Sequence, residues 1–175
     1  MFQSRISVAI LMILVAVASR ILPHPPNFNP LMAVSLFSGA YLLEKKWAYF
    51  VPLAAMLISD LYFGLHDLLP VVYICMAGIV FLGTKLSQNK TWKKTFGYTL
   101  FSSVVFFLVT NFAVWLTSGM YPLNGEGLVT CFTLAVPFFQ NSVAGDLLFT
   151  GILFGSMAFL ERTHFKGELV KVKSN

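Results

Sequence analysis

Six apolar stretches separated by short polar segments account for most of this chain. A helix that crosses the hydrocarbon core of a bilayer needs roughly 17–25 residues. We predict helices over about residues 6–22, 31–43, 47–65, 69–82, 96–117 and 141–160. Only 11% of the 175 residues are charged, whereas soluble domains average about 25%. The sequence therefore predicts an all-α integral membrane protein with one membrane domain over residues 1–175.

Three segments depart from a simple row of spans. Residues 31–43 are short for a span, and they cross the bilayer only if the loop before them completes the distance. Residues 128–139 are apolar but short, and Pro137 interrupts them, so we predict a separate short helix at the outer face. Small residues at 16–19 have the form of a signal-peptide cleavage site. The apolar run continues to Leu22, which favours a retained first helix.

The basic residues give the predicted bundle an orientation. A six-helix layout places eleven of the twelve on one side: Arg5, Lys45, Lys46, Lys85, Lys90, Lys93, Lys94, Arg162, Lys166, Lys171 and Lys173. Only Arg20 lies toward the other side. The positive-inside rule therefore predicts that both termini are cytoplasmic. Attraction of these residues to an anionic leaflet accounts for the net charge of +5 without a nucleic-acid partner.

Residues 23–30 form a proline-rich segment between the first two helices, with four of the chain's eight prolines. Proline restricts its own φ and biases the preceding residue away from the helical region, so this segment is extended or turning. Non-helical backbone at membrane depth is tolerated only against protein or a water-filled cavity. We predict that the segment forms a wall of a ligand site. His24 either contacts the ligand, binds a metal, or bonds to a backbone carbonyl of the loop.

Most other polar side chains fall in the outer half of the predicted bundle, which implies a site open to the outer face. They are His24, Asn27, Asn29, Asp60, His66, Asp67, Asn111, Asn124, Glu126, Asn141 and Asp146. A carboxylate within a span costs about 2.5–3.5 kcal/mol on insertion scales, and such residues face a cavity or pair with another charge. Asp60 and Asp146 are therefore either ligand contacts or partners of Arg20.

The remaining chemical signals are weak. Cys75 and Cys131 have neither a disulfide framework nor metal-ligand spacing. Buried cysteines usually act as small hydrophobic residues, and the alternative is that Cys75 faces the cavity as a soft metal ligand. Gly151 and Gly155 form a small-xxx-small face that lets a neighbouring helix approach closely. Serine-nucleophile, zinc-protease and ATP-binding motifs are absent from the sequence.

Several segments carry a family resemblance: residues 19–30 with their Pro23-His24-Pro25-Pro26-Asn27-Phe28 motif, 37–41, 58–60, 110–115, 121–122 and 137–139. They resemble a bacterial family of small, uncharacterised membrane transport proteins. That family is similar to the substrate-binding S components of energy-coupling-factor (ECF) vitamin transporters. The resemblance covers about residues 19–155 and implies a location in the bacterial cytoplasmic (inner) membrane. It implies a six-helix S-component-like bundle with a cavity near the outer face, walled by the loops after helices one, three and five.

The resemblance also bears on partners. S components that share an ECF energising module often carry an Ala-x-x-x-Ala motif on helix one, and this chain lacks it. Both an ECF partner and a solitary form therefore stay open. In solitary S-component-like proteins for cobalamin, a cavity cysteine meets the cobalt, and the resemblance would give Cys75 that role. No cofactor follows from the sequence.

We predict a membrane-embedded, non-enzymatic transport protein that binds a vitamin-like small molecule for uptake, with a cobalamin-type substrate as a specific guess. The predicted substrate contacts are His24, Asn27, Asp60, Asn111, Asp146 and Cys75. One alternative is a membrane enzyme with a metal site formed by His24, Asp60 and His66. Another is a structural or assembly protein whose grooves pack a partner helix. The predicted partners are the small-molecule substrate and the lipid bilayer.

Overall fold

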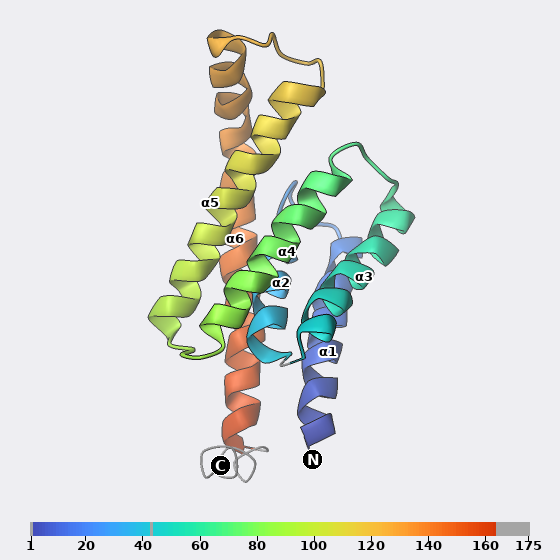
Figure 1. Ribbon diagram of the computed structural model, residues 1–175, viewed down its shortest axis with the longest axis vertical. Helices are drawn as coiled ribbons and strands as arrows, with labels where there is room; N and C mark the ends of the chain where they lie inside the picture. The colour runs from blue at the N-terminus through green and yellow to red at the C-terminus, as the bar shows by residue number, and fades with distance from the viewer. Residues whose placement is uncertain (1, 43, 164–175) are drawn as a thin grey trace.

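The computed structural model describes residues 2–42 and 44–163, which form helices and, in these ranges, no strand (Figure 1). The elements are α1 (Phe2–Ala18), η1 (Ser19–Ile21), α2 (Leu31–Tyr41), α3 (Lys45–Phe63), α4 (Leu69–Leu86), α5 (Trp92–Thr117) and α6 (Gly125–Thr163). The predicted all-α class is confirmed. Three helices, α4, α5 and α6, are long and apolar enough to cross a membrane.

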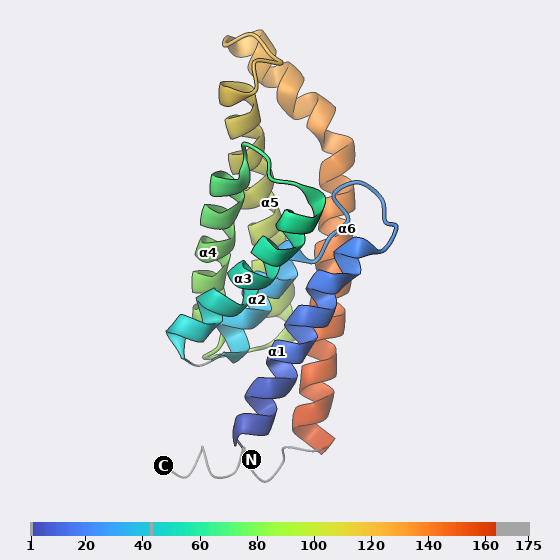
Figure 2. The same cartoon turned by 90° about the vertical axis from the view of Figure 1, so that its right-hand side faces the viewer.

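Helix α2 is the centre of the bundle. All eleven of its residues are buried, and it contacts each of the other five α-helices. Around it α1, α3, α4, α5 and α6 contact one another in turn, and α6 returns to α1 (Figures 1 and 2). Eleven residues give a helix only about 16 Å long. The surrounding helices are longer, so space remains inside the ring beyond the N-terminal end of α2.

Two glycines allow α2 and α4 to approach closely. A Cβ atom on Gly39 would lie 2.9 Å from the Cα of Gly83 and would overlap the carbonyl oxygen of Val80. The predicted close contact at Gly151 and Gly155 is wrong within the described chain. A Cβ on Gly151 would meet nothing within 4 Å, and one on Gly155 only the Trp92 ring at 3.6 Å. Small residues permit a contact, but the helix facing them decides whether it forms.

Helix α6 corrects the predicted division near Pro137. The expected short helix at 128–139 and the span at 141–160 are one helix of 39 residues, with Pro137 inside it. Proline removes one backbone donor, which bends a helix without ending it when both flanks continue the hydrogen-bonded ladder. Figure 2 shows α6 bending between its upper and lower parts.

The connection between the helices predicted at 69–82 and 96–117 is also shorter than expected. Helix α4 continues to Leu86 and α5 begins at Trp92. Thr91 caps α5, because its hydroxyl accepts a hydrogen bond from the backbone N–H of Lys94 at 3.4 Å. Lysine has good helix propensity, and its long side chain reaches water from a helix end. A basic, polar stretch therefore need not end a helix.

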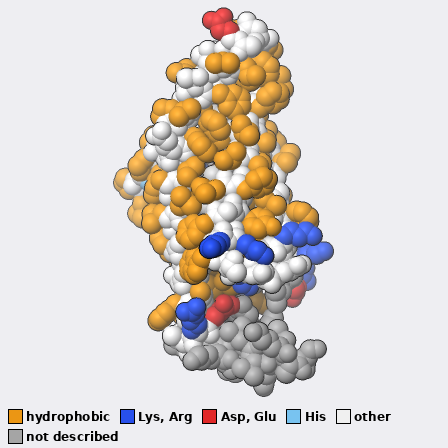
Figure 3. All heavy atoms as spheres, turned by 90° about the vertical axis from the view of Figure 1, so that its left-hand side faces the viewer, with side chains coloured by type: hydrophobic (Ala, Val, Ile, Leu, Met, Phe, Trp, Pro, Cys, Tyr) orange, Lys and Arg blue, Asp and Glu red, His pale blue; other side chains and the backbone are white. Residues whose placement is uncertain are grey.

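The charge distribution divides the surface into two zones. Figure 3 shows the Lys and Arg side chains gathered near the lower end of one face, with hydrophobic side chains over most of the rest. Helix α1 begins and α6 ends at this same lower end (Figure 1). An apolar belt bounded by basic residues is typical of a protein embedded in a membrane.

Candidate functional site

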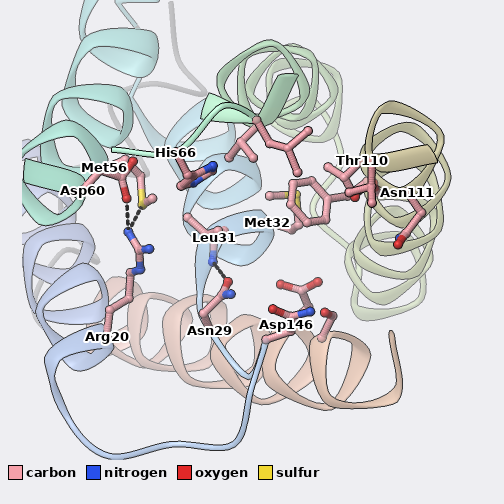
Figure 4. A pocket seen from close by; sticks show the side chains of 16 residues that line it. Arg20, Asn29, Leu31, Met32, Met56, Asp60, His66, Thr110, Asn111 and Asp146 are labelled. Atoms are coloured by element: carbon pink, nitrogen blue, oxygen red, sulfur yellow. Dashed lines mark hydrogen bonds and ion pairs between the residues drawn. The ribbon is translucent and has the colours of Figure 1, made fainter. Parts of the chain in front are cut away.

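A cavity of about 280 Å³ lies at the N-terminal end of α2 (Figure 4). Its polar lining comes from η1, the proline-rich loop, α3, the α3–α4 loop, α5 and α6. These residues are Arg20, Asn27, Asn29, Asp60, His66, Thr110, Asn111, Ser142 and Asp146. Leu31, Met32 and Phe106 contribute apolar surface. The cavity thus combines apolar walls with convergent polar groups, as ligand sites do.

The cavity lies far from the basic end of the bundle. Asp146 precedes Arg162 by 16 residues on α6, which corresponds to a rise of about 24 Å. Asn111 follows Lys94 by 17 residues on α5, a rise of about 26 Å. The hydrocarbon core of a bilayer is about 30 Å thick. These lengths put the cavity slightly less than one hydrocarbon thickness away from the basic end.

One side of the cavity holds a buried ion pair. Asp60 is 3% exposed, and Arg20 Nη1 lies 2.9 Å from its Oδ1. Tyr73 donates its hydroxyl to the other carboxylate oxygen at 2.8 Å. Arg20 also donates to the Ser59 hydroxyl, and its guanidinium carbon lies 5.5 Å from the Phe63 ring centroid. Of the two carboxylates predicted as possible partners of Arg20, the structure pairs it with Asp60.

The other side of the cavity holds a second carboxylate in different surroundings (Figure 4). Asp146 is 2% exposed, and Ser103 donates its hydroxyl to Oδ2 at 2.6 Å. The carboxylate also accepts from the backbone N–H groups of Met32 and Ala33 in the first turn of α2. Among the described residues, no basic side chain forms an ion pair with Asp146. A carboxylate from α6 therefore accepts hydrogen bonds from free N–H groups at the N-terminal end of α2, where the helix dipole is positive.

The proline-rich loop is attached to α6. Asn141 donates its side-chain amide to the carbonyl of Pro26 at 3.0 Å. A Cβ on Gly145 would lie 3.0 Å from the backbone nitrogen of Asn29, so glycine permits the close approach of loop and helix. Asn27 has a φ of 61°, in the left-handed region that asparagine tolerates better than most residues. These contacts hold Asn27 and Asn29 at the cavity.

The structure brings four of the six predicted contact residues together: Asn27, Asp60, Asn111 and Asp146 line the cavity. His24 does not, because its ring lies outside, with Nδ1 2.9 Å from the Pro25 carbonyl oxygen and Nε2 3.2 Å from that of Arg20. This is the expected alternative of a histidine bonded to the loop backbone.

Cys75 also lies away from the cavity lining. It is 8% exposed and buried on α4, three residues and about 4.5 Å deeper than Val72, which does line the cavity. At this depth Cys75 is enclosed between helices, where a cysteine acts as a small hydrophobic residue. Cys131 is likewise a buried free cysteine.

Sequence reasoning missed parts of the site. It did not single out Ser103 or Tyr73, which hold the two carboxylates, or Thr110 and Ser142, which line the cavity. Thr95, Thr99 and Ser103 recur at four-residue spacing, which puts hydroxyls on one face of a helix. That pattern could have revealed Ser103, whereas nothing in the sequence distinguishes Tyr73 from a membrane-interface aromatic.

The metal-site alternative gains no support from the described parts of the chain. No group of three or more His, Cys, Asp or Glu side chains there could hold a metal ion. Asp60 and His66 both line the cavity, but His24, the third expected ligand, does not. The described residues therefore do not assemble the metal site that the sequence suggested.

Comparison with known proteins adds a family but no activity. DUF6580, described as a family of unknown function, matches residues 1–169. No curated protein and no solved structure is significantly similar to the chain. What the site does must therefore be argued from its own geometry.

Proposed function

The chain belongs to DUF6580, a family of unknown function, and from its cavity we propose that it is a membrane-embedded transport protein that binds a small molecule for uptake. It has no enzymatic step: the cavity binds its substrate at the outer face of the membrane. The observation that carries this proposal is the cavity itself, a space in which polar side chains from η1, three α-helices and two loops converge.

The proposed topology has six crossings, with both termini in the cytoplasm of a bacterial cell. Two features support it. Among the described residues, every Lys and Arg except Arg20 lies at or beside a helix end on one side of the bundle, as the positive-inside rule requires. The cavity lies about 24–26 Å from that end along α5 and α6. In this arrangement α2 and the proline-rich loop cross the bilayer together, because α2 is too short alone.

The size of the cavity favours a ligand smaller than cobalamin. A smaller pocket of about 70 Å³ adjoins the cavity that Asp60 and Asp146 line, and it shares Asn27 and Asn111 with that cavity. The larger of these two spaces, at about 280 Å³, is near the lower limit of the roughly 300–1,000 Å³ that small-molecule sites occupy. A corrin macrocycle with its nucleotide exceeds this space, and Cys75 is not placed to reach a cobalt ion. The proposed substrate is a compact polar molecule of vitamin-precursor size.

Native mass spectrometry of the protein, purified in a mild detergent, tests the proposal. We expect a small molecule to co-purify and to be lost or depleted in Asn27→Ala and Asn111→Ala. Each variant leaves ligand polar groups without a partner, at a cost of about 1–3 kcal/mol. His24→Ala and Cys75→Ala are matched controls that leave the cavity lining unchanged. Equal occupancy in all four variants, or no bound molecule in the wild type, would contradict the proposal.

A further inference from the structure

Below Asp146, hydroxyl side chains continue along the contact between α5 and α6. Thr95, Thr99 and Ser103 lie on one face of α5, and Thr150 lies one turn from Asp146 on α6. We call these five residues the α5–α6 seam. Each is at most 2% exposed. The seam is therefore a buried row of polar side chains between two apolar helices.

Hydrogen bonds join the seam residues in two pairs across α5 and α6. Ser103 donates to Asp146 at 2.6 Å, and the hydroxyls of Thr99 and Thr150 lie 3.0 Å apart across the two helices. The Ser103 and Thr99 hydroxyls also lie 3.0 Å from the carbonyl oxygens of Thr99 and Thr95, one turn back along α5. Direct side-chain hydrogen bonds thus join Asp146 to Ser103 and Thr99 to Thr150, and the Ser103 and Thr99 hydroxyls lie one turn apart on the same face of α5.

The seam ends on a cavity at each side. Asp146 lines the 280 Å³ cavity described above. Thr95 lines a second cavity, of about 490 Å³, together with Trp92 and Arg162 at the basic end of the bundle. Thr95 and Ser103 are eight residues apart, about 12 Å along α5. The hydroxyl groups of the seam thus span about 12 Å of the distance between the two cavities.

Helix packing explains the hydroxyls only in part. Serine and threonine commonly join helices within membranes and bond to the carbonyl one turn back. Packing does not require the carboxylate, and intramembrane carboxylates are characteristic of proton relays. In addition, the hydroxyl of Ser102, the residue before Ser103 in the chain, is buried without a hydrogen-bond partner among the described residues.

The groups that face Asp146 leave it able to exchange a proton. Ser103 on α5 and the N–H groups of Met32 and Ala33 on α2 all donate to it. The other titratable and charged groups of the cavity are His66 and the Arg20–Asp60 pair. The opposite charges of Arg20 and Asp60 neutralise each other. Asp146 has no ion-pair partner in the described ranges.

From these contacts we infer that the α5–α6 seam conducts protons between the two cavities. A proton from water in the outer cavity binds to the Asp146 carboxylate and forms the carboxylic acid. It then passes to water and hydroxyls along the seam and is released to water in the second cavity, which restores the carboxylate. Only O–H bonds form and break. This conduction needs no substrate and is therefore separate from the proposed uptake function.

Proton flux into proteoliposomes tests this inference without knowledge of the substrate. Vesicles containing a pH-sensitive dye, with the membrane potential clamped by potassium and valinomycin, are placed in an acidic medium. We expect wild-type vesicles to acidify faster than protein-free vesicles. Asp146→Asn and Thr99→Val should slow this protein-dependent rate at least about tenfold, a factor equivalent to about 1.4 kcal/mol in the barrier. Thr99→Ser, which restores a hydroxyl, should recover most of the rate.

Thr117→Val is the matched control, because Thr117 is an exposed threonine on α5 outside the seam. Thermal unfolding in detergent verifies that each variant is folded, and Thr150→Val replaces Thr99→Val if the latter is not. Wild-type vesicles no faster than protein-free ones would overturn the inference, as would equal rates for Thr99→Val and Thr117→Val. Failure of the uptake proposal is seen separately, as absence of a co-purified molecule, because the dye assay uses no substrate.

Discussion

Asp60 and Asp146 are two carboxylates in one cavity, and the protein stabilises them in different ways. Asp60 has a full positive charge beside it, the Arg20 guanidinium at 2.9 Å, and a phenol at 2.8 Å. Asp146 has a serine hydroxyl and the N-terminal N–H groups of α2. The first arrangement is a closed ion pair. The second relies on dipoles, so a change of protonation at Asp146 leaves no opposite charge buried and unpaired.

The two networks also join different parts of the bundle. The Asp60 network connects η1, α3 and α4 through Arg20, Ser59 and Tyr73. The Asp146 network connects α6 and α5 to the start of α2. The cavity lies between these two halves (Figure 4). A ligand that contacts both carboxylate networks would therefore tie the halves together.

The largest effect is expected when the ion pair is broken from one side. Arg20→Met leaves the Asp60 charge buried without a cation, which should lower the free energy of unfolding by about 3 kcal/mol. The double variant Arg20→Met/Asp60→Asn removes both charges and should recover most of that loss. Chemical unfolding in detergent micelles measures both. If the single and double variants have the same free energy of unfolding, the unpaired charge of Asp60 does not destabilise the protein.

A smaller loss is expected at Asp146. Asp146→Ala leaves the Ser103 hydroxyl and two N–H groups of α2 without their acceptor, which should cost about 2 kcal/mol. Asp146→Asn keeps one acceptor oxygen for the α2 N–H groups, and its amide can donate to the Ser103 hydroxyl, so the main loss is the favourable charge–dipole interaction, about 1 kcal/mol. The same unfolding measurement ranks the two. An Asn variant as unstable as the Ala variant would mean that the negative charge itself holds α2.

The next largest effect is expected where the proline-rich loop packs against α6, on the same side of the cavity as Asp146. Gly145→Val places methyl groups against the backbone of Asn29 and should destabilise the protein by about 1.5 kcal/mol through overpacking. Gly151→Val, on the same helix, is the control, because a Cβ there meets no atom within 4 Å. Differential scanning fluorimetry compares their melting temperatures. If both variants have the same melting temperature, close contact between the proline-rich loop and α6 does not stabilise the protein.

The smallest effect is expected at Tyr73. Tyr73→Phe removes one hydrogen bond to Asp60 and leaves the contact with Arg20, so the expected loss is about 1 kcal/mol. Chemical unfolding can resolve this difference when wild type and variant are measured side by side. The result that contradicts the comparison is a Tyr73→Phe variant as unstable as Arg20→Met, since Arg20 would then contribute no more than a neutral donor.

The described part of the chain follows several expectations from sequence closely. Apolar stretches became helices, and the proline-rich segment formed the irregular connection before α2. Asn27, Asp60, Asn111 and Asp146 converge, as expected for costly polar groups on apolar helices. These outcomes depend on hydropathy and backbone preference, which are properties of each segment by itself.

Other features were decided by tertiary structure. Whether Pro137 ended or bent a helix depended on the chain continuing as a helix on both sides. Arg20 had two possible carboxylate partners, and the neighbouring helices brought it to Asp60. Cys75 lay beyond the cavity because of its depth and direction on α4. A sequence shows which residues avoid lipid, but which helices pack together determines what those residues meet, because those contacts join segments far apart in the chain.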